Sequence, residues 1–369
     1  MTAKRTILIT IAVLLLIFVG LVVYNLFLKN RTTTPFSFFR TPEESLGEAP
    51  TPSPESPFIR LTNEPIAGFR VVDNEIVVVG VDGQFRRLDF FGETLNEESQ
   101  SNLSGLVKAA VNPGGNAAAI TITDQETADE HWVLLEEMGR LQTLPAGTIG
   151  LSFSPQGKIL TTTEQNSKTI LSVKQGTEIK NIFETSVLDV VVIWANENTV
   201  LITTKPSGLA PGIAYSLDVN TKKLTRLLGS QNGLSALLPQ QLNRIVFSET
   251  STDGRGLSFK VLDLSNQTER TLPVSTLPEK CIFSQDNRTL FCAAFVSNPT
   301  SSIMPDDYYK GVFANDSNTF VRINLESDRV ETIVNEIPVD AIELQLSPDE
   351  QSLFFINKKD GALYRLKLD

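Results

Sequence analysis

From Phe58 to the C-terminus, apolar runs alternate with short polar turns, and the pattern returns about every forty residues. Each copy is an apolar run, a polar turn and a second apolar run, which predicts a β-hairpin. A unit of this size can bury both of its faces only by stacking on its neighbours, so the pattern predicts a repetitive all-β body. The clearest copies are LSFSPQGKILTTT (Leu151–Thr163), CIFSQDNRTLFCAAF (Cys281–Phe295) and LQLSPDEQSLFFIN (Leu344–Asn357).

The predicted strands fall into groups of four, which gives seven repeats. A polar turn between the third and fourth strands also recurs, and its Asp and Asn residues suit tight turns because their side chains bond the local backbone. The first and fifth repeats are less distinct, so six or eight repeats are the alternatives. Copies of the recurring turn are LDVNTKKL (Leu217–Leu224), LDLSNQTER (Leu262–Arg270) and INLESDRVET (Ile323–Thr332).

The two ends of the repeat region complement each other. The seventh repeat lacks a fourth strand, and FIRLT (Phe58–Thr62) is a strand left over before the first repeat. Pairing them would close the repeats into a ring and remove two exposed sheet edges. Seven four-stranded repeats closed in this way form a β-propeller. We therefore predict an all-β, seven-bladed β-propeller over residues 58–369.

The N-terminal pattern is different. Thr6–Leu28 contains no charged residue, and as a helix it would span about 34 Å, enough to cross a hydrocarbon core of about 30 Å. We predict a single-pass transmembrane anchor over residues 6–28, with residues 1–5 in the cytoplasm and the propeller outside. The flanking positive charges are nearly balanced and orient the helix only weakly. A cleaved signal peptide is the alternative, although YNLFLKN offers no small-x-small cleavage site.

Residues 29–57 are rich in Pro, Ser, Thr and Glu, and they predict a disordered, extended linker. Phe36, Phe38 and Phe39 are unusual in a linker and are expected at the membrane interface. Anchor and linker together place the protein at the bacterial cytoplasmic membrane, with its propeller on the outer side.

Two turns of the repeat region resemble those of a known family. FSPQG (Phe153–Gly157) and LSPDE (Leu346–Glu350) are similar to the turns of TolB-type bacterial propellers, which are also described as PD40 or WD40-like. The resemblance covers the propeller region only and implies its fold. The chain departs from TolB in its predicted anchor and in having no separate N-terminal α/β domain, so the binding of TolB to Pal is not carried over. The layout is more similar to uncharacterised membrane-anchored propellers.

Composition excludes some classes of function. The net charge of −11 and the pI of about 4.8 argue against nucleic acid as a partner, because phosphates need basic surfaces. His131 is the single histidine, which disfavours a His-rich metal site and a Ser-His-Asp triad. Sequence motifs for a nucleophile elbow, a phosphate loop or a Cys-x-x-Cys site are absent, so we expect no cofactor and no metal.

Long loops gather at one predicted end of the propeller. Turns between second and third strands share that end with the crossings between repeats, and several of these turns are long. Long loops on a rigid scaffold commonly carry binding, and the alternative is that their lengths drifted without function. The loops are Asp124–Glu130, Glu164–Lys168, Lys205–Gly212, Glu249–Gly256 and Val296–Ser317.

The longest loop supplies the candidate binding residues. Its tyrosines and methionine are good contact residues, and its two adjacent aspartates could hold Ca²⁺ or a cationic partner, although Ca²⁺ needs six to eight oxygens. The alternative is a self-packed loop whose tyrosines cover the top of the sixth repeat. The candidates are Met304, Asp306, Asp307, Tyr308, Tyr309 and Lys310.

The two cysteines lie at mirrored positions of one predicted hairpin. Its turn is centred between Asp286 and Asn287, so Cys281 and Cys292 should face each other across the strands. Opposed residues lie within disulfide range, and outside the cytoplasm the bond is expected to form. Two buried free thiols are the alternative.

These patterns predict a non-enzymatic binding module that is tethered to the membrane and recognises a protein or a cell-envelope polymer. The alternative function is a carboxylate-dependent glycan hydrolase or lyase. Asp306 and Asp307 would be a poor acid–base pair in an extended loop, because adjacent side chains then point to opposite sides. A purely structural element of an envelope complex is a third interpretation.

Overall fold

The computed structural model describes residues 58–97, 103, 106–123, 130–137, 139–176 and 178–368. The chain divides into two compact units, Met1–Ser37 and Phe38–Asp369, and every described residue belongs to the second. None of the helices in this described part is long and apolar enough to span a membrane. The predicted anchor at residues 6–28 and the linker at residues 29–57 lie outside the described residues.

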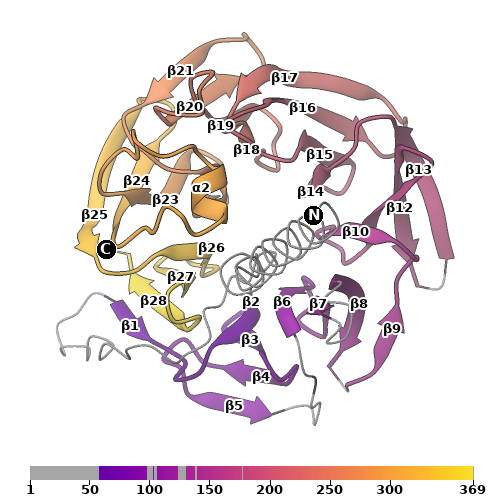
Figure 1. Ribbon diagram of the computed structural model, residues 1–369. Helices are drawn as coiled ribbons and strands as arrows, with labels where there is room; N and C mark the ends of the chain where they lie inside the picture. Colours follow the sequence, from indigo (N-terminus) through magenta and orange to yellow (C-terminus); the bar gives the residue numbers. More distant parts are fainter. Residues whose placement is uncertain are drawn as a thin grey trace, which may run out of the picture. The chain divides into compact units, whose positions relative to one another are not determined.

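The described part is a ring of seven four-stranded antiparallel sheets, as the repeat pattern predicts (Figure 1). In each blade the first strand is innermost and the fourth is at the rim. Blade 1 contains β2 (Ile66–Val72), β3 (Glu75–Gly80), β4 (Phe85–Leu88) and β5 (Thr94–Glu97). Blade 2 contains β6 (Leu106–Val111), β7 (Ala117–Thr123), β8 (Glu130–Glu136) and β9 (Leu141–Thr143). Blade 3 contains β10 (Thr148–Phe153), β11 (Ile159–Gln165), β12 (Lys168–Gln175) and β13 (Glu178–Thr185).

The remaining blades follow the same plan. Blade 4 contains β14 (Val190–Asn196), β15 (Thr199–Thr204), β16 (Pro211–Asp218) and β17 (Leu224–Asn232). Blade 5 contains β18 (Ser235–Leu237), β19 (Arg244–Glu249), β20 (Ser258–Asp263) and β21 (Glu269–Leu272). The short helix η2 (Pro278–Lys280) leads into blade 6, which contains β22 (Cys281–Phe283), β23 (Thr289–Phe295), β24 (Asn318–Asn324) and β25 (Arg329–Ile337). Blade 7 contains β26 (Ala341–Leu346), β27 (Ser352–Asn357), β28 (Leu363–Lys367) and the N-terminal strand β1 (Phe58–Arg60).

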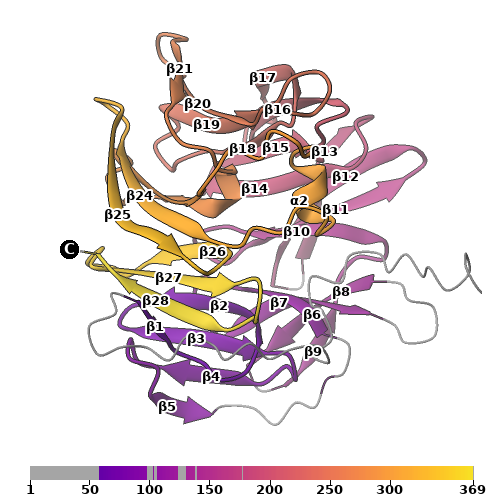
Figure 2. The same ribbon diagram turned by 60° about the vertical axis from the view of Figure 1, so that its left-hand side comes forward.

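The ring closes by the predicted pairing of its two ends. Strand β1 runs antiparallel to β28, with Phe58 opposite Leu366, and lies at the outer edge of blade 7 (Figure 2). Just beyond β1, the Leu61 N–H donates to the Leu363 carbonyl at 2.8 Å. Closure of this kind makes one blade from both ends of the propeller and leaves no open pair of edges between them.

Apolar clusters join the blades pairwise, with one exception. Buried side chains of neighbouring blades pack together at the seams between blades 1 and 2, 3 and 4, 4 and 5, 5 and 6, 6 and 7, and 7 and 1. Among the described residues no such cluster spans the seam between blades 2 and 3. On β11 that seam receives Thr161 and Thr163, because they alternate with Leu160, which packs toward blade 4.

One loop expectation was wrong. The segment Glu164–Lys168 was predicted to be a long loop, but β11 and β12 pair as far as Gln165 and Lys168. Only Asn166 and Ser167 form the turn, with φ of 52° and 59°. Two consecutive residues with positive φ match the twist of the flanking strands and make a tight hairpin. Asparagine tolerates this conformation comparatively well.

Candidate functional site

Two surfaces of the ring are candidates for binding: the exposed side chains of the innermost strands, called here the axial surface, and the loop-bearing end. The loop-bearing end holds the crossings between blades and the turns between second and third strands, including residues 205–210, 250–257 and 296–317. The opposite end, called here the plain end, holds the short turns.

One sector of the axial surface is apolar. On β10 and β14, Ile149, Val191 and Ile193 are 45%, 40% and 36% exposed. On β14 they alternate with Val190 and Val192, which are buried against blade 3. Apolar surface left in water forgoes about 25 cal/mol for each Å² that could be buried. This sector is therefore an apolar surface that the described part of the ring leaves uncovered.

Another sector of the axial surface is charged. Lys108 on β6 lies 3.2 Å from the carboxylate of Glu343 on β26, and the negative charge of this carboxylate raises the pKa of Lys108. The side chain of Lys108 is 57% exposed, so the ion pair adds little stability. Arg70 on β2 is half-buried, and burial lowers its pKa. Arg70 makes no hydrogen bond or ion pair with another described residue, so this sector keeps a positive charge without a fixed counter-charge.

Glu279, on η2, links the long loop at the loop-bearing end to the innermost strand of blade 5, β18. Its carboxylate accepts hydrogen bonds from the Tyr309 hydroxyl at 2.5 Å and from the Ser235 hydroxyl at 3.0 Å. Burial and the negative charge of Glu279 raise the pKa of Tyr309 well above its usual value. Tyr309 is therefore a neutral, fixed donor and is not free to contact a ligand through its hydroxyl.

The two candidate aspartates of the long loop are occupied. Asp306, at the start of α2 (Asp306–Tyr309), accepts hydrogen bonds from the Ser207 hydroxyl at 3.1 Å and the Gly208 N–H at 2.6 Å. Asp307 accepts from the Ile303 N–H at 2.8 Å. Both carboxylates satisfy backbone donors, which binds the loop to itself and to blade 4. Within the described ranges there is no group of three or more His, Cys, Asp or Glu side chains that could hold a metal ion.

Two of the predicted contact residues are in the core. Met304 is 0% exposed and Tyr308 is 2% exposed, and both pack with Leu257, Leu277 and Phe295. They cannot present a contact surface in this conformation, which corrects the expectation for these two positions. Apolar burial decides their placement, because the long loop must cover the apolar end of blade 6. Lys310 is exposed.

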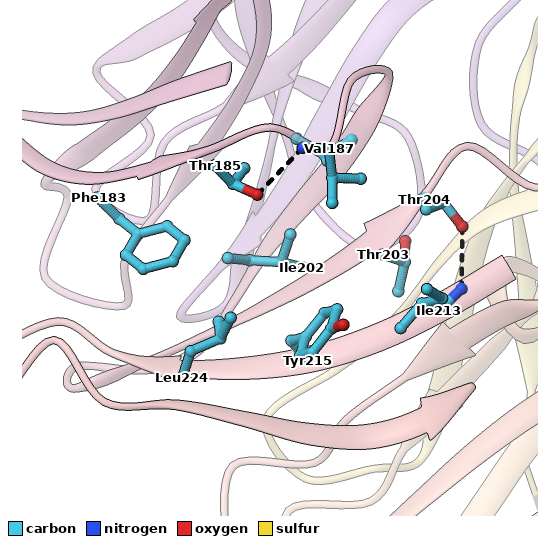
Figure 3. A pocket seen from close by; sticks show the side chains of 10 residues that line it. Phe183, Thr185, Val187, Ile202, Thr203, Thr204, Ile213, Tyr215 and Leu224 are labelled. Atoms are coloured by element: carbon cyan, nitrogen blue, oxygen red, sulfur yellow. Dashed lines mark hydrogen bonds between the residues drawn. The ribbon is translucent and has the colours of Figure 1, made fainter. Parts of the chain in front are cut away.

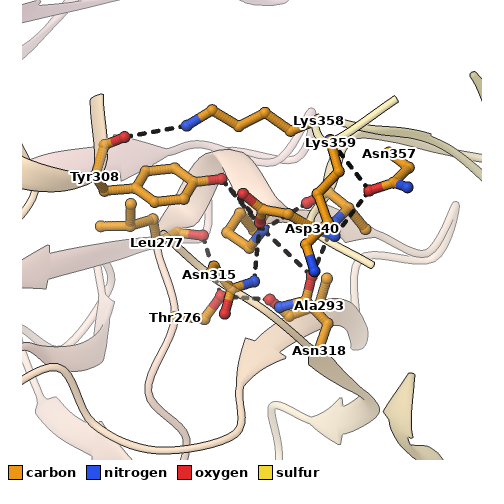
Figure 4. A network of polar contacts seen from close by, with 12 residues as sticks. Thr276, Leu277, Ala293, Tyr308, Asn315, Asn318, Asp340, Asn357, Lys358 and Lys359 are labelled. Carbon is orange, nitrogen blue, oxygen red and sulfur yellow. Dashed lines mark hydrogen bonds and ion pairs between the residues drawn. The ribbon is translucent and has the colours of Figure 1, made fainter. Parts of the chain in front are cut away.

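A buried polar network lies beneath the loop (Figure 4). The ammonium group of Lys280, which is 0% exposed, donates to Asp340 Oδ1 and to the Ala341 carbonyl, both at 2.6 Å. The same Asp340 oxygen accepts from the Tyr308 hydroxyl at 3.1 Å and from Asn315 at 2.9 Å. Burial lowers the pKa of Lys280, although Asp340 opposes the shift. A buried charge pair needs such additional hydrogen bonds to offset its desolvation.

The long loop of blade 6, residues 296–317, is also tied to blades 4, 5 and 7, and it is called here the strap. Asp306 ties it to blade 4, and the Met304 N–H donates to the Gly254 carbonyl of blade 5 at 2.8 Å. On the other side, Lys358 of blade 7 donates to the Tyr308 carbonyl at 3.0 Å and lies 3.9 Å from the centre of its ring. These ties favour the self-packed loop over a free one.

The strap still leaves apolar side chains in solvent. Val312 is 72% exposed, and Leu209, in the neighbouring loop of blade 4, is 61% exposed. Neither residue stands out in the sequence, because single apolar residues in loops carry no pattern. Both lie at the loop-bearing end on segments held by the hydrogen bonds described above.

The cysteines are joined in the structure. Cys281 and Cys292 oppose each other in the β22–β23 pairing, as the hairpin arithmetic predicts, and their sulfurs lie 2.12 Å apart. Both side chains are buried, at 7% and 0% exposed. The bond links the innermost strand of blade 6 to its neighbour.

Two hollows lie among the described residues at the blades. A mostly apolar cavity of about 70 Å³ lies between blades 3 and 4, with Phe183, Ile202 and Tyr215 in its wall (Figure 3). It has room for a few water molecules and not for a substrate. A groove of about 320 Å³ beside β20 and β21 is lined by apolar, hydroxyl and amide groups and has no charged side chain.

Known proteins resemble this chain in fold only. The chain matches no protein-family model and no curated protein sequence. The structure of TolB from Acinetobacter baumannii is 15% identical, with a TM-score of 0.45, over 73% of this chain and 63% of TolB, so the chain spans less than two thirds of that protein. An oligogalacturonate lyase in complex with manganese is 11% identical, with a TM-score of 0.57, over 85% of this chain and 93% of the lyase.

An oligogalacturonate lyase from Vibrio parahaemolyticus is 9% identical, with a TM-score of 0.56, over 84% of this chain and 93% of that chain. The TM-scores of the two lyases, 0.57 and 0.56, show that the propeller fold is shared. Identities this low do not carry a substrate, a partner or an activity to this chain.

Proposed function

We propose that this protein is a membrane-anchored, extracytoplasmic binding module without enzymatic activity, which recognises a protein or an envelope polymer through its loop-bearing end. The observation that carries the proposal is the strap. It is held by blades 4, 5 and 7 and yet leaves Val312 exposed at 72%, and Leu209 of the loop to which it is tied is exposed at 61%. Apolar contact residues on a rigid support bind without a large ordering cost.

Two features support the proposed location. The charge-free stretch at residues 6–28 has the length of a transmembrane helix. The Cys281–Cys292 disulfide is of a kind that persists in oxidising compartments and is rare in the cytosol. A propeller on the outer side of the membrane accounts for both features.

The chemistry of the strap supports binding over catalysis. A glycan hydrolase or lyase needs carboxylates that are free to exchange a proton with substrate. Asp306 and Asp307 instead accept hydrogen bonds from protein donors. Glu279 is likewise held by Tyr309 and Ser235.

Photo-crosslinking of the full-length protein in intact membranes tests the proposal. A photoreactive amino acid is placed at Val312 or, as a matched control at the plain end, at Phe91, which is 70% exposed. We expect a protein adduct or a glycan-bearing adduct from position 312 and not from position 91. Equal adducts from both positions, or none from either, would contradict binding through the loop-bearing end.

A glycan panel separates the two functions. Turnover of any glycan that is lost on substitution of Glu279→Gln would favour the lyase or hydrolase alternative. Binding without turnover would favour the module.

A further inference from the structure

We propose that the acidic linker segment Phe38–Pro57 of this same chain docks on the axial surface of the propeller, with the glutamates on the charged sector. In this proposal Phe38 and Phe39 cover the apolar sector and do not lie at the membrane interface, where the sequence pattern alone would put them. This interaction is independent of the partner recognised at the loop-bearing end. Its basis is the match between an uncovered surface of the ring and the chemistry and length of the segment that leads into it.

The apolar match concerns blades 3 and 4. Ile149, Val191 and Ile193 are exposed on the innermost strands and have no cover in the described part of the chain. Phe38 and Phe39 are two adjacent aromatic side chains of a proline-rich linker whose other large apolar residues are Phe36 and Leu46. Burying a phenylalanine against branched aliphatic side chains removes apolar surface of both from water.

Charge complementarity supplies the second argument. Arg70 is half-buried on the innermost strand β2 without a partner among the described residues. Lys108 on the neighbouring β6 already pairs with Glu343, so Arg70 is the group that a linker carboxylate would meet. From position 41 to position 57 the chain contains acidic residues and neither Lys nor Arg. A carboxylate is the ordinary partner of a partly buried guanidinium, because it can accept two parallel N–H bonds. The acidic side chains are Glu43, Glu44, Glu48 and Glu55.

The length of the linker fits this path. Phe58 begins β1 at the plain end and outer edge of blade 7. The three gaps between the four strands of blade 7, each about 4.8 Å, add to about 14 Å. The linker must then pass the axis of the ring to reach β10 and β14, which lie across from blade 7 (Figure 1). The residues from Phe39 to Phe58 span about 60 Å when extended. Because β14 runs from the loop-bearing end to the plain end, Ile193 lies nearer than Val191 to the side from which the linker comes.

Thiol cross-linking within the full-length chain tests the docking. Phe38→Cys is combined with Ile193→Cys on the axial surface, and the linked peptides are quantified by mass spectrometry with the native disulfide intact. The matched control combines Phe38→Cys with Ile179→Cys, since Ile179 is 47% exposed on β13, the outermost strand of blade 3. We expect about tenfold more intramolecular product from the Ile193 pair, because docking raises the local concentration of the two thiols.

Charge reversal in the linker tests the electrostatic part without touching the ring. Glu43→Lys together with Glu44→Lys should lower the Ile193 cross-link about threefold to tenfold, and added salt should lower it in the unmodified linker. Serine at the same two positions is the milder control. Equal yields from the Ile193 and Ile179 pairs would overturn the proposal. So would a product formed only between two chains, or protection of Phe38 by lipid with no axial product. None of these results depends on whether a partner binds at the loop-bearing end.

Discussion

The seam between blades 6 and 7 is filled by apolar side chains, whereas the seam between blades 2 and 3 also buries threonine hydroxyl groups. At the first seam, Phe355 packs against Phe320 and Tyr364, with ring centres 5.1 and 5.7 Å away, inside a large apolar cluster. At the second seam, the buried side chains include Thr121 and Thr161, which alternate along their strands with Ile120 and Leu160 of the neighbouring clusters.

Hydroxyl groups make the seam between blades 2 and 3 a weaker joint. A buried hydroxyl needs a hydrogen-bond partner, and the contact from Thr161 to the Ser172 carbonyl is long, at 3.4 Å. Across the same seam Lys174 donates to Gln142 at 3.3 Å. The seam between blades 6 and 7 lies next to the blade that joins the two ends of the ring. Strong apolar packing there offsets the entropy of closing a long chain segment.

Removal of an aromatic ring from the strong seam should have the largest effect. Phe355→Ala leaves a cavity between Phe320 and Tyr364 and should lower the free energy of unfolding by about 3–5 kcal/mol. Chemical denaturation measures the change. A loss below about 1 kcal/mol would show that this seam is not the stronger joint.

Removal of one partner of the buried ion pair should have a similar but slightly smaller effect. Asp340→Leu leaves the Lys280 ammonium group without its counter-charge and should cost about 3 kcal/mol. The double variant Asp340→Leu with Lys280→Met should recover much of this loss, because no charge then remains buried. Additive losses in the double variant would contradict the assignment of the pair.

The weak seam should respond in the opposite direction. Thr161→Val keeps the shape of the side chain and removes a poorly bonded hydroxyl, so the free energy of unfolding should change by less than about 1 kcal/mol and should rise. Hydrogen exchange should also report faster opening in β7, β8 and β11 than in β23 and β27. Equal protection from hydrogen exchange at both seams would show that the seam between blades 2 and 3 is no weaker than the seam between blades 6 and 7.

The smallest expected difference in stability between blades comes from aspartate carboxylates in their turns, and it depends on pH. In blades 6 and 7, Asp286 and Asp349 accept from the hydroxyls of Ser284 and Ser347, and these bonds lower the pKa of both carboxyl groups. A folded-state pKa below the unfolded value near 3.9 contributes stability above about pH 4, and this contribution is lost as the pH falls through the lowered pKa.

Blade 3 has Gln156 at the equivalent turn position, so its turn has no such titration. The double variant Asp286→Asn with Asp349→Asn should therefore flatten the acid limb of the stability curve, while Gln156→Asn leaves it unchanged. Thermal unfolding between about pH 2 and pH 6 is the measurement, because the contribution is lost below the ordinary pKa of an aspartate. An unchanged acid limb in the double variant would show that other carboxylates set it.

Strand positions and ring closure were predictable because they depend on local pattern. The pairing of β1 with β28 follows from a missing strand at one end and a spare strand at the other. Opposition of Cys281 and Cys292 follows from the centre of one hairpin. The first strand of blade 5 was indistinct because Ser235–Leu237 is too short to show an alternation.

The candidate site was less predictable, since residue type does not report burial. Met304 and Tyr308 have the chemistry of contact residues, but the apolar end of blade 6 buries them. Asp306 looks like a metal ligand in sequence and acts as an acceptor for Ser207 and Gly208, about a hundred residues earlier. Val312 became a candidate only from its exposure.

The sequence by itself determined the repeat, the closing strand and the opposed cysteines, because each depends on periodicity along one chain. It favoured seven blades over six or eight, and the structure decided the number. Tertiary structure alone decided which seams are apolar, which loop residues are buried and where Lys280 meets Asp340. Those outcomes depend on contacts between segments that are far apart in sequence. Such contacts follow from how the blades fit together around the ring, and local pattern carries no record of that fit.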